Sequence, residues 1–238
     1  MKRFVICICC LLLTFKVCAQ EQDQSTISDN IINSYFTEVK SSAVIYSGKE
    51  EPNYKFPIMN HPYLDTDRFR YGKISFDGKE YPNVLFRLNQ EIGELIVLSA
   101  NSRFSVIVPK NRVDYATIDS AYIYYLDSKS AADVLLPEGY YVRLYNGDNK
   151  VVKREVFYLL SSINNAYNVE YSYQKSIKIY IQKDGSYHPV KNKRSVLNFF
   201  SSKKKDLKKF IRQSGLSFSK NPDEAIVAVA KYYDELNK

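Results

Sequence analysis

Short runs of β-type sequence follow one another from residue 73 to residue 181, and turn residues separate them. For many runs in succession, no gap is long enough to hold a helix that would cross over between parallel strands. This pattern is typical of an antiparallel sheet, in which neighbouring strands need only short connections. We therefore predict a β-rich α+β protein, with an antiparallel meander sheet or a partly closed barrel or sandwich, followed by C-terminal helices.

The individual strands can be placed from their alternation and their flanking turns. Asp77-Gly78 and Asn146-Gly147 each lie between two apolar runs and tolerate the positive φ of tight hairpins, so we predict a hairpin at both. The predicted strands cover residues 73–76, 84–88, 94–98, 104–108, 113–118, 121–126, 139–145, 151–159, 169–173 and 177–181.

Helical spacing of apolar residues marks four segments. The first is 28–40, with Ser28 available as an N-cap. Two short faces follow the strands: Val196, Leu197, Phe199 and Phe200 form one, and Leu207, Phe210 and Ile211 form another that ends at Gly215. The last helix has Asn221 as its cap, Pro222 at its first position and acidic residues in its first turn.

The first 19 residues have the layout of a secretory signal. Lys2 and Arg3 precede an apolar run over residues 4–15, which is shorter than the roughly 20 residues that span a bilayer as a helix. Val17-Cys18-Ala19 forms the predicted cleavage site, with Gln20 as the first mature residue. Lipidation of Cys18 is an alternative, although Val17 is not the small residue that usually precedes a lipidated cysteine.

All four cysteines lie within residues 1–19, so the expected mature chain has none. Thiolate zinc sites and cysteine nucleophiles are thereby excluded. We expect four parts: a signal peptide (1–19), an N-terminal helix with an irregular wrapping segment (20–72), an antiparallel β body (73–190) and a basic helical subdomain (191–238). We expect the protein to be periplasmic or associated with the outer membrane, without being an integral membrane protein.

The basic residues concentrate near the C-terminus, where residues 182–238 hold 13 Lys and Arg against 6 Asp and Glu. An exported protein rarely meets nucleic acid, so lipid headgroups or acidic glycans are the anionic partners to consider. The alternative is an ordinary solvated helix face, which we favour. The lysines concerned are Lys203, Lys204, Lys205, Lys208 and Lys209.

The most enzyme-like cluster is His61, Asp65 and Asp67, because an imidazole beside two carboxylates could bind a metal or transfer protons. Arg68 and Arg70 favour the simpler interpretation, a solvated loop in which the arginines neutralise the acids. The sequence has no glycine-rich phosphate loop, no G-x-S-x-G elbow and no H-E-x-x-H motif. We predict no cofactor and no metal.

Several strings give the chain a family resemblance: Tyr46-Ser47-Gly48-Lys49-Glu50, His61-Pro62-Tyr63, Ile74-Ser75-Phe76-Asp77-Gly78, Tyr187-His188-Pro189-Val190-Lys191 and Ala230-Lys231-Tyr232-Tyr233-Asp234. In these the chain resembles a family of uncharacterised exported proteins from Bacteroides-type Gram-negative bacteria. The resemblance implies a periplasmic or outer-membrane association and assigns no activity.

Taken together, these features favour a non-enzymatic exported envelope protein that binds a partner protein or a ligand. Peripheral contact with acidic envelope lipids is compatible with the basic C-terminal region. The alternative is a metal- or carboxylate-dependent hydrolase that uses His61, Asp65 and Asp67.

Overall fold

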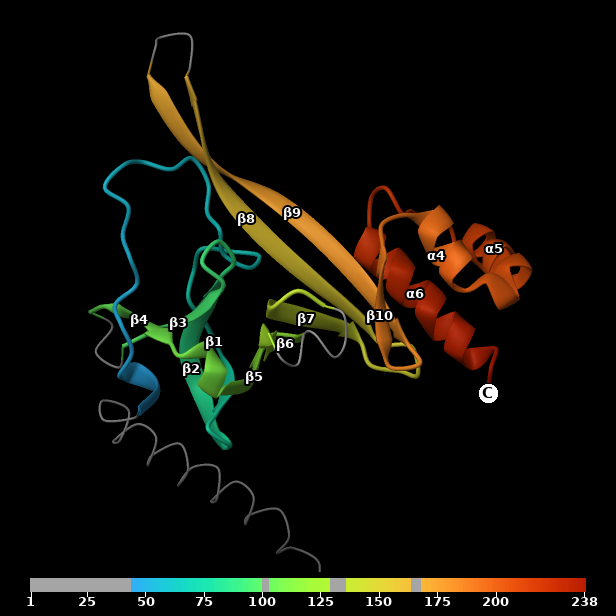
Figure 1. Ribbon diagram of the computed structural model, residues 1–238, viewed down its shortest axis with the longest axis horizontal. Coiled ribbons are helices and arrows are strands. Elements are labelled where there is room, and N and C mark those ends of the chain that lie inside the picture. The colour runs from blue at the N-terminus through green and yellow to red at the C-terminus, as the bar shows by residue number, and fades with distance from the viewer. Residues whose placement is uncertain (1–43, 100–102, 129–135, 164–167) are drawn as a thin grey trace, which may run out of the picture. The chain divides into compact units, whose positions relative to one another are not determined.

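Ten strands form one antiparallel sheet that does not close into a barrel (Figure 1). The spatial order is β10-β9-β8-β7-β6-β5-β1-β2-β3-β4, so two meanders meet where β5 pairs with β1. The strands are β1 (Arg70–Phe76), β2 (Lys79–Asn89), β3 (Glu94–Leu98), β4 (Ser105–Val108), β5 (Val113–Ile118), β6 (Ala121–Leu126), β7 (Gly139–Tyr145), β8 (Val151–Ile163), β9 (Val169–Lys183) and β10 (Ser186–Val190). The predicted β-rich α+β class is confirmed.

This computed structural model describes residues 44–99, 103–128, 136–163 and 168–238. The export segment and the helix predicted at 28–40 lie outside the described residues. Two short 3₁₀ turns precede strands within them: η3 (Val44–Tyr46) and η4 (Lys110–Arg112).

Four predicted strands, at 94–98, 113–118, 121–126 and 139–145, have the observed bounds, and the others overlap an observed strand. The runs predicted at 169–173 and 177–181 belong to the single strand β9, because Gln174-Lys175-Ser176 pairs with β8 although it is polar. β10 was not among the predicted strands, and it contains Pro189, which is unfavourable in a central strand. It is tolerated because β10 lies at the edge of the sheet.

The two predicted turns differ from each other. At the β1–β2 hairpin Asp77 and Gly78 have φ of 51° and 72°, as a tight two-residue turn requires. The hairpin predicted between β7 and β8 is confirmed, because the two strands pair. Neither Asn146 nor Gly147 has a positive φ, so the connection is not the tight turn that this dipeptide favours. Gly147 instead allows the Tyr145 side chain to lie close to the backbone, because an added Cβ would lie 2.1 Å from the Tyr145 hydroxyl.

The sheet curls around an apolar interior. Residues opposite each other in the register share a face, as in Phe86↔Val97 and Leu88↔Leu95, and these four side chains are buried. The curl brings β8 back to the β2–β3 turn, where the Phe157 N–H donates to the Gln90 carbonyl over 3.3 Å. The sheet is therefore partly wrapped, with a seam between β8 and that turn.

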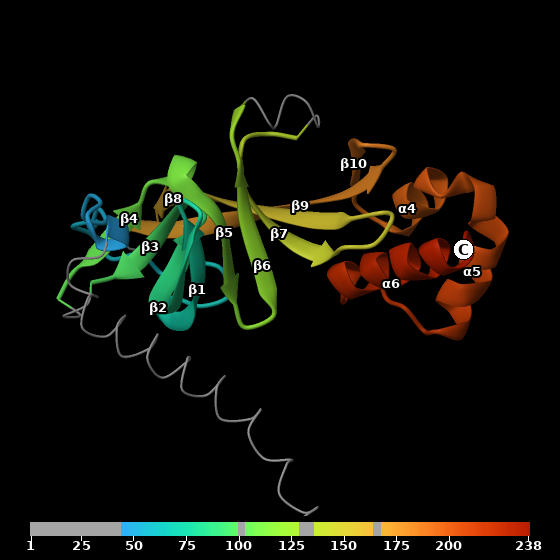
Figure 2. The same cartoon turned by 90° about the horizontal axis from the view of Figure 1, so that it is seen from below.

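Three helices follow the strands: α4 (Lys193–Phe199), α5 (Lys204–Gln213) and α6 (Pro222–Glu235), with the 3₁₀ turn η5 (Ser201–Lys203) between α4 and α5 (Figure 2). α4 begins with a capping box between Asn192 and Ser195. α6 has Pro222 in its first turn as predicted, but the predicted cap Asn221 donates to the Glu224 carboxylate instead of accepting from the backbone.

The C-terminal end of α5 follows the prediction. Gly215 has φ of 62°, and the Leu216 N–H donates to the Ile211 carbonyl over 3.3 Å. Leu207 and Ile211 are buried, while Phe210 stacks on Tyr232 of α6 with ring centroids 4.2 Å apart. The apolar face predicted for this helix is thus packed.

The helices and the end of the sheet share one apolar cluster, which includes Val151 of β8, Ile181 of β9 and Ile226 of α6. Polar contacts reinforce it. Asp234 of α6 accepts hydrogen bonds from the β7–β8 connection, and Lys153 of β8 pairs with Asp223 of α6 at 2.9 Å. The helices are therefore bound to the sheet by burial and by charge.

Candidate partner-binding site

The hairpin of β8 and β9 extends beyond the strands on either side of it (Figure 1). Its pairing runs without interruption from Val151↔Ile181 to Ile163↔Val169. β7 accompanies β8 only as far as Lys153, and β10 accompanies β9 only from Ile179 onward. The outer half of the hairpin is therefore a two-stranded ribbon with two edges of its own.

The hydrogen bonds of the ribbon determine which backbone groups face outward. In an antiparallel pair, every second residue bonds to the partner strand and the residues between point away from it. Phe157 points outward, because its N–H donates to Gln90 across the seam. By the same alternation, Leu159, Ser161 and Ile163 present their N–H and C=O groups outward.

The edge of β9 is covered by an extended segment of the same chain. The Met59 N–H donates to the Tyr171 carbonyl over 3.0 Å, and Ile58 forms a parallel bridge with Tyr171. The Asn60 side chain bonds to both backbone groups of Tyr173. Phe56 stacks on the Tyr171 ring with centroids 4.1 Å apart. Backbone and aromatic contacts together thus protect this edge.

Two tyrosine hydroxyls fasten the ribbon and its covering segment to the β2–β3 turn. Tyr173 and Tyr54 donate to the Glu91 carboxylate over 2.9 Å and 2.8 Å. Burial, and then the hydrogen bond to Glu91, raises the pKa of Tyr173 above its ordinary value. The Tyr173 hydroxyl therefore stays protonated, and able to donate, to a higher pH than an ordinary tyrosine.

The edge of β8 is not covered by any described residue. No hydrogen bond from the described part of the chain reaches the outward groups of Leu159, Ser161 and Ile163, which we call the open edge. The run 156–163 contains no charged residue and no proline. Side chains here are exposed: Tyr158 by 55 %, Leu160 by 47 % and Ile163 by 72 %.

Proteins usually protect exposed strand edges with charges, proline or a covering segment. The open edge has none of these within the described residues, whereas the neighbouring β9 edge has a covering segment. Our sequence prediction ended this strand at residue 159, because Ser161-Ser162 is polar. The uncharged run 156–163 was the available signal for a longer strand.

The three residues of the enzyme-like cluster have separate partners. His61 accepts through Nδ1 from the Tyr63 N–H over 3.3 Å. Asp65 has φ of 60° and pairs with Arg70 at 3.6 Å, so the backbone there is not the extended one that would put both aspartates on one face. Asp67 is exposed, and its side chain accepts from Thr66. The described residues contain no group of three His, Cys, Asp or Glu side chains suited to a metal ion.

The five lysines of the predicted anion-contacting surface lie on α5 and the turn before it. Lys205, Lys208 and Lys209 are exposed, whereas Lys203 and Lys204 are half-buried, and Lys204 donates to the Asn198 side chain over 2.9 Å.

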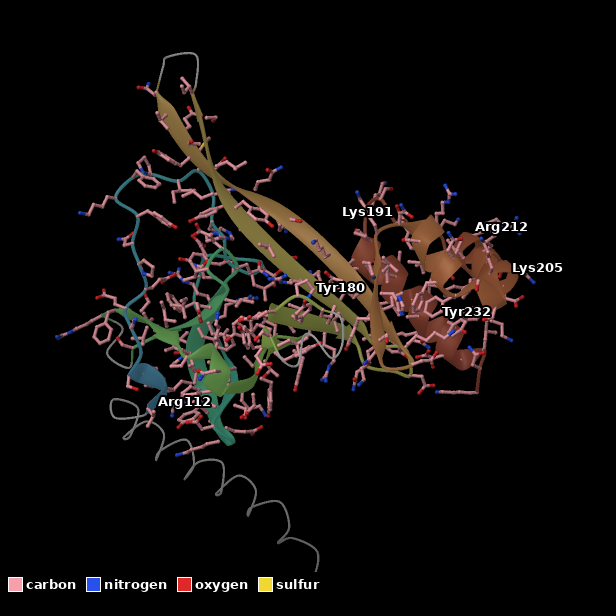
Figure 3. The ribbon with its side chains drawn as sticks, in the orientation of Figure 1. Arg112, Tyr180, Lys191, Lys205, Arg212 and Tyr232 are labelled. Carbon is pink, nitrogen blue, oxygen red and sulfur yellow. The ribbon has the colours of Figure 1, made fainter. Side chains whose placement is uncertain are left out.

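A hollow of about 840 Å³ lies beside α5, and Lys193 and Arg212 line it together with the three exposed lysines. Figure 3 labels two of these cations, Lys205 and Arg212. Asp206 is the acidic residue in this lining. Within the described ranges, none of the five cations that line the hollow forms an ion pair.

Comparison with known proteins finds no matching family model, no similar curated protein and no similar solved structure. Among the described residues, no helix has both the length and the apolar character needed to cross a membrane.

Proposed function

We propose that this chain is a non-enzymatic exported envelope protein that binds a partner protein through the open edge of β8. The observation that carries the proposal is an uncharged strand edge with outward backbone groups and exposed apolar side chains. Peptide segments bind such edges as an additional strand: backbone hydrogen bonds hold the segment, and alternate side chains provide specificity. The export and the envelope location rest on the sequence features of residues 1–20 and on the family resemblance.

The covered edge of β9 indicates what kind of segment fits the ribbon. There an extended stretch contributes one aromatic ring, one backbone bridge at Ile58 and one side-chain amide that bonds to the strand backbone. We infer that the partner contributes an extended segment of similar character, with apolar residues at alternate positions. Such a segment would pack on the exposed side chains of Tyr158 and Leu160, which lie on the same face of the ribbon.

Backbone bonds alone would not hold this partner. The three outward residues can exchange at most about six hydrogen bonds, each worth about 1 kcal/mol net. Association costs at least about 4 kcal/mol in lost freedom of motion, so at most about 2 kcal/mol would remain, which is weaker than millimolar binding. Burial of apolar surface, at about 25 cal/mol per Å², must therefore supply most of the affinity. The exposed apolar side chains of the ribbon would provide this surface.

The test uses Ser161, whose N–H points outward and takes no part in the β8–β9 pairing. Ser161→Pro removes this donor and obstructs an added strand, whereas the matched control Ser161→Val keeps the donor and favours a strand. The mature protein carries a photocrosslinking residue at Ile163 and is exposed to envelope extract. We expect one defined adduct, lost in Ser161→Pro and kept in Ser161→Val.

Hydrogen exchange distinguishes strand addition from unspecific capture. In the purified complex, the outward amides of Ser161 and Ile163 should become protected, while the inward amides of Leu160 and Ser162 exchange slowly with or without the partner. An adduct without this alternation would contradict strand addition. A concentration-dependent dimer of the pure protein that Ser161→Pro abolishes would show that a second copy is the occupant, and would overturn the partner assignment.

Peripheral contact with acidic envelope lipids is a second candidate function. The observation that favours it is the set of five cations around the hollow beside α5, which form no ion pair within the described residues. Anionic headgroups attract such clusters with a strength that falls as salt rises.

A further inference from the structure

The hollow beside α5 lies in a part of the chain that carries charge of almost one sign. Residues 191–220, which contain α4 and α5, hold 10 Lys and Arg against one acidic residue, Asp206. Within the described residues, no hydrogen bond or ion pair reaches the side chains of the five cations that line the hollow. All five are exposed: Lys193 at the start of α4, and Lys205, Lys208, Lys209 and Arg212 on α5.

Four of these cations share one side of α5. Their positions are three or four residues apart, so they follow one another over about 10 Å of the helix. Like charges at these spacings destabilise a helix. The helix dipole favours Asp206 in the first turn and Arg212 in the last turn, but it disfavours Lys205. The stability of α5 therefore does not explain this arrangement, whereas an external anion does.

The helical part offers no exposed large apolar side chain for insertion into lipid. Among the described residues, the exposed large apolar side chains lie between Val44 and Ile177, and residues 191–238 contribute none. Phe210 is not available, because it stacks on Tyr232 with ring centroids 4.2 Å apart. Contact of this part with a membrane therefore stays at the level of the headgroups and depends on charge.

The concave shape favours one kind of anionic headgroup. A flat layer of singly charged phosphodiester headgroups would contact the rim of the hollow, whereas a group that projects from the layer can lie among the cations. A phosphomonoester is such a terminal group, with a charge of about −1.5 to −2 at pH 7 and three acceptor oxygens. Each lysine ammonium has three donors and binds phosphate as a point charge, so several lysines can share one phosphate.

We propose that the hollow beside α5 binds the phosphomonoester headgroup of an envelope lipid. Lys193 of α4 and the four cations of α5 supply the positive charge and the donors for the phosphate oxygens. Asp206 lines the same hollow and opposes an anion, but its single charge is outweighed by five positive charges. This inference rests on the lipid-contact function proposed above, and it specifies the headgroup.

Two double variants with the same net charge test the site. Lys193→Gln with Lys208→Gln removes one cation of each helix from the hollow. The matched control is Lys191→Gln with Lys220→Gln, which removes two exposed lysines of the same helical part that do not line the hollow. Both variants should keep the melting temperature, because exposed charges contribute little to stability.

Binding of the mature protein is measured on vesicles that contain either phosphatidic acid, a phosphomonoester lipid, or phosphatidylglycerol, a phosphodiester lipid, at equal surface charge. We expect the unaltered protein to prefer the phosphatidic acid vesicles. The hollow variant should lose at least about tenfold in affinity for them, and the control variant less than about threefold.

The outcomes separate this site from the lipid-contact function. Equal affinity for the two kinds of vesicle, or equal losses in the two variants, would leave that function in place and overturn the headgroup site. Absence of binding to either kind of vesicle would reject both. Saturation by inorganic phosphate at micromolar concentration, without tighter binding to vesicles, would make the ligand a soluble phosphate and the lipid assignment wrong.

Discussion

Replacing Asp234 by alanine should separate the C-terminal helix from the β7–β8 connection. Asp234 is 3 % exposed and accepts from the Tyr145 hydroxyl over 2.9 Å, from the Asn149 N–H over 3.2 Å and from the Asn149 side-chain amide. All three donors come from residues 145–149, more than 80 positions earlier in the chain. One carboxylate thus connects two distant segments.

The loss in free energy of unfolding depends on which hydrogen-bond donors lose their partner in Asp234→Ala. Asn149 is 7 % exposed, so its two donors stay buried in the variant, at about 1 to 3 kcal/mol each. Tyr145 is half-buried and can bond to water, so it adds little. We expect Asp234→Ala to lower the free energy of unfolding by about 4 kcal/mol, and Tyr145→Phe to lower it by about 1 kcal/mol.

Urea denaturation of the mature protein, followed by circular dichroism, measures both values. If Asp234→Ala proves too unstable to purify, Asp234→Asn keeps one acceptor and should lose about half as much. A loss below about 1 kcal/mol for Asp234→Ala, with an unchanged urea slope, would refute the reasoning, because it would mean that both Asn149 donors find other partners.

Four other outcomes can be measured on the same protein. Leu207→Ala should cost about 2 to 5 kcal/mol in urea unfolding, because this side chain is fully buried; a cost near zero would contradict the packing of α5. Burial, and then the hydrogen bond to Asp234, raises the pKa of Tyr145 to about 12, so its stabilising contribution is full below pH 10 and is lost between pH 10 and 12. The melting temperature should fall in that interval, and less steeply in Tyr145→Phe. Lys205→Gln with Lys208→Gln should leave stability nearly unchanged; loss of salt-sensitive binding to acidic vesicles in this variant would favour the lipid-contact function over a solvated helix face. Intact mass of the protein from its native host should correspond to a chain that begins at Gln20 without an acyl group, and a mass that retains residues 1–19 or an acyl group on Cys18 would contradict the export prediction.

The fold was predictable where local chemistry decides it. Asp77-Gly78 has the positive φ that this dipeptide favours, and the alternation in residues 121–126 predicted the bounds of β6. Tertiary contacts decide the cases that the sequence did not reveal. Gly147 is required by the approach of Tyr145 and Asp234, and Pro189 is compatible with β10 because β9 pairs with it at the sheet edge.

The candidate sites were harder to predict from the sequence than the fold. An open edge exists only once the lengths of neighbouring strands are known, and Lys153 and Ile179 mark where those neighbours stop. The hollow beside α5 includes Lys193, which comes from α4 and shares no local pattern with the lysines of α5. The five lysines were visible from the beginning, because a charged helix face is a local pattern.

β8 connects three regions of the molecule. Val151 lies in the cluster beneath the helices, Lys153 holds Asp223, Phe157 bonds across the seam, and Ile163 ends the open edge. Because side chains alternate along a strand, a slip of one residue would turn every one of these groups to the opposite face. β8 therefore cannot slide, and any motion of the ribbon has to be a bend or a twist about the seam. Such a bend would centre near the Phe157–Gln90 hydrogen bond, while the helices hold the Val151 end of β8 in place.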